Sequence, residues 1–137
     1  MKLVERLIVA SIMFVQCSEK TTDYKDLLAV DELPKEHSIT FKQELVPDGK
    51  LIHRGILNPQ LDTYYFTLSD KSFNQFDIYF VERKNGKWST PKKTFFNSDY
   101  KDHGMSFSPD GNTIYFSSTR PVDDYDVADT WHIWKSV

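Results

Sequence analysis

The sequence has a single cysteine, Cys17, and few of the residues that interrupt regular structure. One cysteine excludes a disulfide framework within the chain. Only five glycines and six prolines occur among 137 residues, whereas aromatic residues make up 15%. This balance favours a folded β protein over a disordered chain. A hydrophobic content of 39% is enough for the core of one small domain.

Positive charge is also scarce, because 17 lysines and arginines are outnumbered by 20 aspartates and glutamates, which leaves a net charge of −3. The sequence shows no basic stripe, so we expect no nucleic-acid partner. Beyond the N-terminus, no apolar run approaches the roughly 18–20 residues of a membrane-spanning helix. Composition therefore predicts one small soluble domain.

Motifs that carry chemistry are missing as well. There is no Gly-x-Ser-x-Gly, no phosphate-binding loop and no Cys/His pair, so we expect neither an enzyme nor a cofactor. The acidic run from Asp123 to Asp129 lacks the glycines and spacing of an EF-hand loop, and we interpret it as a solvated loop rather than a Ca²⁺ site. Two of the four histidines hold equivalent positions in the repeat described below, which indicates a structural role rather than a metal site; the four are His37, His53, His103 and His132.

Residues 1–16 have the pattern of an export signal. Lys2 and Arg6 accompany a nine-residue apolar run that stops just before Cys17. A lone cysteine after such a run resembles the lipobox of bacterial lipoproteins, in which the thiol carries the lipid. Gln16 stands where that motif usually has Gly, Ala or Ser. We predict a lipid anchor at Cys17; the alternative is an ordinary signal peptide that leaves this cysteine buried.

Residues 103–120 combine two strand patterns with a turn. Residues 108–112 read Ser-Pro-Asp-Gly-Asn, in which proline presets φ, aspartate bonds local amides and glycine accepts a positive φ. Residues 113–117, Thr-Ile-Tyr-Phe-Ser, follow as a β-branched and aromatic strand. This stretch predicts a β-hairpin.

The same pattern occurs once more, fifty residues upstream. Residues 58–67 match residues 108–117 position by position, with the Pro, Thr, Tyr and Phe identical. Leu61 stands where the second copy has Gly111, which leaves open whether the two turns are of one type. The next aromatic strand recurs at an offset of 55, which predicts about five extra residues in a loop of the second copy. A period of this length with several strands per unit is typical of propeller blades.

The repeat divides residues 38–137 into two antiparallel blades. Blade one, about residues 53–96, has patterns for four strands, with the type I′ hairpin signal Asn85-Gly86 before the fourth. Blade two, about residues 103–137, has patterns for the first three strands only, so about one and three-quarter blades are present. A polar tether over residues 17–37 precedes them. We expect the three tryptophans to pack within the blades: Trp88, Trp131 and Trp134.

We expect fewer than two blades to be unstable alone, because stacked repeats generally need about three units to be stable. The third strand of blade two would also be an exposed aromatic edge, open to pairing with another chain. We interpret the chain as a truncated or partial reading frame; the alternative is a ring assembled from several copies.

These features resemble the WD40-like (PD40) repeats of the TolB-type β-propeller family of exported bacterial proteins. The resemblance runs from about residue 50 to the end and implies closed rings of blades. It depends on a set of repeat-motif residues to which we assign a structural role: Pro59, Tyr65, Phe66, Asp77, Asn85, Gly86, Trp88, Phe107, Ser108, Pro109, Asp110, Gly111, Tyr115, Phe116 and Arg120.

The resemblance implies a non-catalytic binding or scaffold module, exported and lipid-anchored, in the periplasm or at the outer membrane. Its partners would be the membrane, through the anchor, and a protein, peptide or glycan ligand. Two alternatives stay open. The chain could be the N-terminal propeller fragment of a dipeptidyl-peptidase or tricorn-like peptidase, or a truncated, non-functional gene product. No catalytic residue is assigned.

Overall fold

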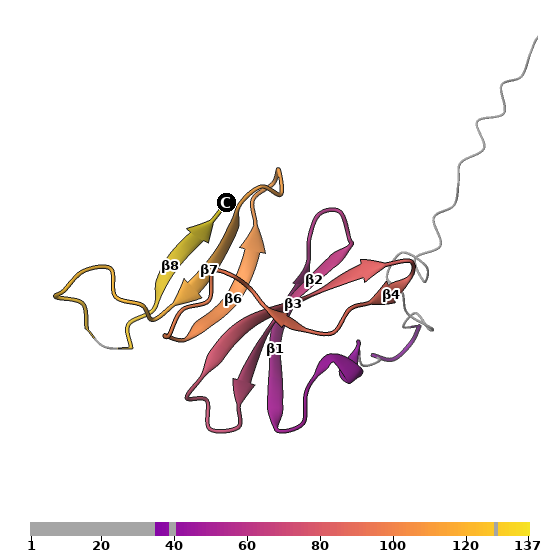
Figure 1. Cartoon of the computed structure of the whole chain (residues 1–137), viewed down its shortest axis with the longest axis horizontal. Coiled ribbons are helices and arrows are strands. Elements are labelled where there is room, and N and C mark those ends of the chain that lie inside the picture. Colours follow the sequence, from indigo (N-terminus) through magenta and orange to yellow (C-terminus); the bar gives the residue numbers. More distant parts are fainter. Residues whose placement is uncertain (1–34, 39–40, 128) are drawn as a thin grey trace, which may run out of the picture.

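Two antiparallel β-sheets pack against each other in this protein (Figure 1). The structure, a computed structural model, describes residues 35–38, 41–127 and 129–137. The predicted signal peptide, Cys17 and most of the predicted tether lie outside the described residues. Within the described ranges, no helix has the length and apolar character needed to cross a membrane.

The first sheet has the strand order β1-β2-β3-β4, and the second has the order β6-β7-β8. β5 also pairs with β3, so β4 and β5 together form a broken outermost strand. Apart from the short 3₁₀ helix η1, the described residues are strands and loops, which confirms the predicted all-β fold and its antiparallel blades. The bounds are η1 (Gln43–Leu45), β1 (Lys50–Leu57), β2 (Thr63–Asp70), β3 (Phe76–Lys84), β4 (Lys87–Trp88), β5 (Lys92–Lys93), β6 (Asp102–Phe107), β7 (Ile114–Ser118) and β8 (His132–Ser136).

The turns that join the first two strands of each sheet have the same hydrogen bonds. In the first sheet, the amide of Leu61 donates to the carbonyl of Asn58 at 2.9 Å, and in the second the amide of Gly111 donates to Ser108 at the same distance. Leu61 and Gly111 both have positive φ, 58° and 75°. The two turns are therefore of one type, and the repeated hydrogen bonds hold Leu61 in the left-handed region despite its side chain.

The first strand of each sheet carries a β-bulge at an equivalent place in the repeat. The pairing register shifts between Ile52 and Gly55 in β1, and between His103 and Met105 in β6. Bulges bend and twist a strand locally, so a bulge at the same place gives both strands the same local distortion. The two units therefore share this bulge as well, although strand propensity alone does not specify a bulge.

Pairing between the second and third strands also recurs. Tyr65 pairs with Phe80 in the first sheet, and Tyr115 pairs with Lys135 in the second. The second-strand residues differ by 50 positions and the third-strand residues by 55. The extra five residues therefore lie in the loop between β7 and β8, as the sequence predicts.

Equivalent phenylalanines of the two sheets face the same direction along the stack. Phe66 packs beneath Leu45 of η1 on the face of the first sheet that points away from the second. Phe116 packs against Ile78 of β3, in the core between the two sheets. The first sheet therefore contacts the second in the way that the η1 segment contacts the first, which is the arrangement expected of successive units in a stack.

The opposite faces show the complementary pattern. Tyr65 points into the core between the sheets, with its ring centroid 5.5 Å from that of Phe107. Tyr115, the equivalent residue of the second sheet, is 40% exposed. The face that the first sheet buries against its neighbour is thus open to solvent on the second sheet.

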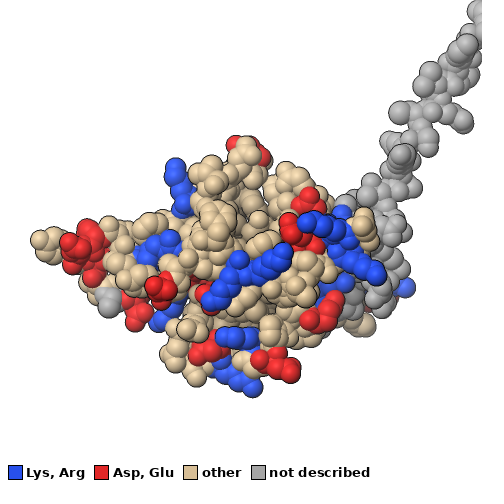
Figure 2. Space-filling view, viewed as in Figure 1, with Lys and Arg blue, Asp and Glu red and all other residues tan. Residues whose placement is uncertain are grey.

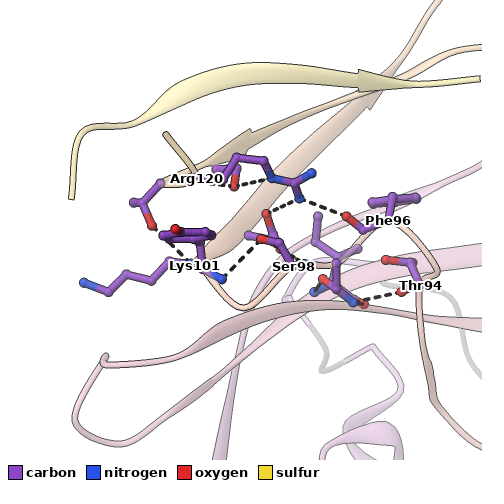
Figure 3. A network of polar contacts seen from close by, with 11 residues as sticks. Thr94, Phe96, Ser98, Lys101 and Arg120 are labelled. Atoms are coloured by element: carbon purple, nitrogen blue, oxygen red, sulfur yellow. Dashed lines mark hydrogen bonds and ion pairs between the residues drawn. The ribbon is translucent and has the colours of Figure 1, made fainter. Parts of the chain in front are cut away.

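A buried ion pair fastens the connection between β5 and β6 to the second sheet (Figure 3). Arg120 donates through Nη2 to Asp102 Oδ1 and to the carbonyl of Phe96, both at 2.9 Å. Ser98 donates to the other carboxylate oxygen of Asp102 from its amide at 2.6 Å and its hydroxyl at 2.9 Å. The side chain of Asp102 is 0% exposed, and a charge this deep is tolerated because it is paired and hydrogen-bonded.

Candidate ligand-binding cleft

A cleft of about 300 Å³ lies where loops of the two sheets meet. The turn between β2 and β3, the connection between β5 and β6, and the ends of the loop between β7 and β8 enclose it. The lining is polar apart from two aromatic rings and consists of Asn74, Gln75, Phe76, Asp77, Lys93, Ser98, Asp99, Tyr100, Lys101, Thr119 and Asp129. This size is at the lower end of small-molecule sites, about 300–1,000 Å³.

Both lysines of the cleft are paired with carboxylates of the cleft itself. Lys93 Nζ lies 2.9 Å from Asp77 Oδ2, and Lys101 Nζ lies 2.8 Å from Asp129 Oδ1. The hydrogen bond to Asp77 raises the pKa of Lys93. Both ammonium groups of the cleft are therefore already neutralised by carboxylates in the absence of a ligand.

Four other side chains of the lining make no hydrogen bond within the described part of the chain. They are two amides, a carboxylate and a phenol: Asn74, Gln75, Asp99 and Tyr100. Asp70 Oδ1 accepts from the backbone amides of Asn74 at 2.8 Å and Gln75 at 3.2 Å, which fixes the turn that carries both. The cleft thus combines a fixed backbone with uncommitted polar side chains.

The backbone on the other side of the cleft is fixed too. The amide of Lys101 donates to Thr119 Oγ1 at 3.1 Å, and the amide of Thr119 donates to the Lys101 carbonyl at 3.0 Å. Together with the Asp102 network, these bonds hold Ser98, Asp99 and Tyr100 against the second sheet (Figure 3). Both walls are therefore pre-organised, which reduces the entropy lost on binding.

A cluster of aromatic and histidine rings adjoins the cleft through Phe76, which belongs to both. The rings of His53 and His103, one from each sheet, lie 5.6 Å apart between centroids. Phe73 and Trp131 flank Phe76 with centroid separations of 6.2 and 6.3 Å. Burial lowers the pKa of His103, and the neighbouring His53 and Arg54 lower it further.

The tryptophans divide between core and surface. Trp88 and Trp134 pack against the two hydrophobic cores, as predicted. Trp131 is outside both cores and 46% exposed, and the rest of its ring packs against Phe76 and His103. The cause is the insertion before β8, which places Trp131 at the end of a loop beside Phe76.

The predicted repeat-motif residues build the blades, and only Asp77 among them lines the cleft. In the turns, Ser108 Oγ donates to Asp110 Oδ1 at 2.5 Å and lowers the pKa of that carboxyl, as suits a turn residue. Arg120 belongs to the buried network and Tyr115 to the open face. The others lie in turns, hairpins or cores: Pro59, Tyr65, Phe66, Asn85, Gly86, Trp88, Phe107, Pro109, Gly111 and Phe116.

The acidic loop between β7 and β8 is mostly exposed, as predicted, and acidic side chains gather at the left of the view in Figure 2. Asp126 is the exception, because its side chain is 10% exposed and its Oδ2 lies 2.6 Å from His132 Nε2. Asp123 Oδ1 accepts from the amide of Tyr125 at 2.9 Å, and Asp126 Oδ2 accepts from Val122 at 3.0 Å. Within the described ranges, no three metal-ligating side chains form a group. Elsewhere on the face shown, basic and acidic side chains are interspersed (Figure 2).

Comparison with protein-family models, with curated proteins and with solved structures gave no match. The functional assignment therefore depends on the repeat, the N-terminal sequence and the cleft.

Proposed function

We propose that this protein is an exported, lipid-anchored module of the β-propeller type that binds a ligand of the bacterial cell envelope and performs no chemistry on it. The cleft between the two sheets is its binding site. The N-terminal sequence carries the export and anchoring part of the proposal, through the apolar segment that ends at Cys17. The resemblance to WD40-like repeats of the TolB type carries the binding-module part.

One observation supports the cleft as the site more than any other. Uncommitted polar side chains from two different sheets converge there on a backbone that other hydrogen bonds already fix. Asn74, Gln75, Asp99 and Tyr100 are exposed and have no side-chain partner among the described residues, so in the free protein they bond to water, which a ligand can replace. Lys93 and Lys101, in contrast, are already paired with carboxylates.

Anchoring is tested by the Cys17→Ser substitution in the expressing bacterium. The substitution removes the thiol that would carry the lipid, so the protein should move from the membrane fraction to the soluble fraction. Each buried methylene of a lipid contributes about 0.8 kcal/mol, and a lipoprotein cysteine carries more than one chain, so the change should be large. An unchanged fractionation would contradict the anchor.

Binding is tested with the soluble Cys17→Ser protein and isolated bacterial envelopes. We expect saturable binding that Tyr100→Ala weakens at least tenfold, because Tyr100 lines the cleft and is 50% exposed. Tyr125→Ala is the matched control, since Tyr125 is 94% exposed on the loop between β7 and β8 and does not line the cleft. Non-saturable binding, or an equal loss in both variants, would contradict the assignment of the cleft.

A further inference from the structure

We propose that the cleft binds a neutral glycan, that is, a chain of uncharged sugar residues. This inference rests on the proposed function, because it takes the cleft as the binding site and names the chemical class of its ligand. Three properties of the lining carry it: its charge, its hydrogen-bonding groups and its aromatic rings.

The charge of the lining disfavours ionic ligands. Lys93 and Lys101 are each within 2.9 Å of a carboxylate of the cleft, so a phosphate or carboxylate ligand would have to compete with an existing partner. Asp99 is the one lining carboxylate with no bonded partner among the described residues, and it is exposed. A single exposed carboxylate attracts a cation weakly, because water screens it.

The uncommitted groups match hydroxyl groups. The side-chain amides of Asn74 and Gln75 each donate and accept, the carboxylate of Asp99 accepts, and the phenol of Tyr100 does both. A sugar hydroxyl also donates and accepts, so neighbouring hydroxyls of one ring can bond to an amide and a carboxylate together. An apolar ligand would leave these groups without partners, which costs free energy.

The geometry disfavours an extended peptide. Peptides commonly bind by adding a strand to an exposed sheet edge, through main-chain hydrogen bonds. Three residues of the lining lie in strands of the first sheet: Phe76, Asp77 and Lys93. Next to these residues the outer edge of β3 is already occupied: the amide of Thr94 donates to the carbonyl of Ile78, and the amide of Ile78 donates to Asn97 Oδ1.

Aromatic rings complete the match. Phe76 and Tyr100 line the cleft, and the rings of the half-exposed Phe73 and Trp131 lie 6.2 and 6.3 Å from that of Phe76 between centroids. A pyranose ring presents C–H bonds on its faces, which pack on the negative face of an aromatic ring. A chain of sugars could therefore extend from the cleft over Trp131, with its hydroxyl edges turned to the amides.

The test uses the full-length Cys17→Ser protein and a panel of uncharged tetrasaccharides of glucose, galactose, mannose and N-acetylglucosamine. Sulfated and sialylated counterparts and unrelated tetrapeptides complete the panel. We expect at least one neutral tetrasaccharide to bind in titration calorimetry. The Asn74→Ala/Gln75→Ala double variant and Asp99→Asn should each weaken that binding at least tenfold.

Matched controls come from the N-terminal part of the described chain. Gln43→Ala and Asp48→Asn change an exposed amide and an exposed carboxylate away from the cleft, and both should leave the affinity unchanged. Thermal unfolding of every variant verifies that the fold persists. Binding limited to charged glycans or peptides, or no binding to any glycan, overturns the inference.

Failure of this inference is distinguishable from failure of the proposed function. If the protein binds envelopes saturably through Tyr100 but no neutral glycan, the module stands and the ligand class is wrong. If it binds neither envelopes nor glycans, both proposals fail.

Discussion

At the residue scale, two histidines at equivalent repeat positions bring imidazole rings from both sheets together. His53 Nε2 lies 2.7 Å from the hydroxyl of Ser69, whereas His103 is surrounded by His53, Phe76 and Trp131. Arg54 also bears on His103. The interface between the sheets therefore contains a titratable group whose pKa is lowered by burial and by two basic residues, with no carboxylate among the groups that shift it.

Stability should fall as the pH falls because of His103. Its pKa is lowered in the folded state by burial and then by His53 and Arg54, so the unfolded chain binds a proton more readily. Free energy of unfolding rises with pH wherever the unfolded state binds more protons. This contribution is therefore full above the unfolded pKa of about 6.5 and is lost as pH falls below that value toward the lower folded pKa.

Urea unfolding of the wild type and His103→Phe at pH 7 and pH 5 measures this effect. The phenylalanine keeps a ring in the cluster but removes the titration, so the variant should lose less stability between the two pH values. His37→Phe, which changes an exposed histidine, should behave as the wild type does. Equal losses in wild type and His103→Phe would show that His103 contributes nothing.

At the element scale, the two hairpin turns stack on each other. A Cβ atom placed on Gly111 would lie 2.9 Å from Cγ of Pro59, in the equivalent turn of the first sheet. This contact explains why glycine occupies position 111. Leu61 holds the equivalent position in the first unit, where η1 replaces a preceding blade, and tolerates the same positive φ.

Substituting Gly111 should therefore cost more than backbone strain alone. Gly49→Ala is the matched comparison, because Gly49 has φ 78° against 75° for Gly111 and has nothing within 4 Å of its Cβ position. We expect Gly49→Ala to lower the free energy of unfolding by about 1–2 kcal/mol, from strain. Gly111→Ala should lose a further ~1–3 kcal/mol, from overpacking against Pro59. Equal losses in chemical denaturation would contradict the stacked turns.

Two further equivalent positions carry side chains of very different size in the two units. A Cβ on Gly55 would collide with the ring of Tyr64, whereas the equivalent residues of the second sheet are Met105 and Ile114. The first unit thus has a glycine and a tyrosine at the two positions where the second unit has a methionine and an isoleucine. This exchange hides the repeat from residue-by-residue comparison.

Strands, hairpins and the five-residue insertion were predictable because they depend on local patterns. Turn residues, alternation and β-branched strands are visible in the sequence. The packing of Leu45 on Phe66 was not predictable, since no local pattern indicates that a 3₁₀ helix packs on that face of the sheet. The cleft was missed for the same reason: Asn74, Asp99 and Asp129 are far apart in sequence and meet only because the sheets stack.

At the scale of the whole molecule, the two sheets are successive units of one repeat that stack in the same direction. Phe66 and Phe116 face toward η1 and the first sheet respectively, and Tyr65 and Tyr115 face the other way. The cleft depends on this stacking, because its walls come from both units. If the sheets did not pack in this way, the cleft would not exist.

A double-mutant cycle between Tyr65 and Phe107 tests this stacking most directly. Their rings join the two sheets at 5.5 Å, and aromatic pairs of this kind contribute about 0.5–1.5 kcal/mol beyond area burial. We predict a coupling free energy in that range for Tyr65→Ala with Phe107→Ala. Tyr65→Ala with Tyr125→Ala, on the distant exposed loop, should be additive within about 0.3–0.5 kcal/mol. Additive behaviour of the Tyr65 and Phe107 substitutions would contradict the packing of the second sheet on the first.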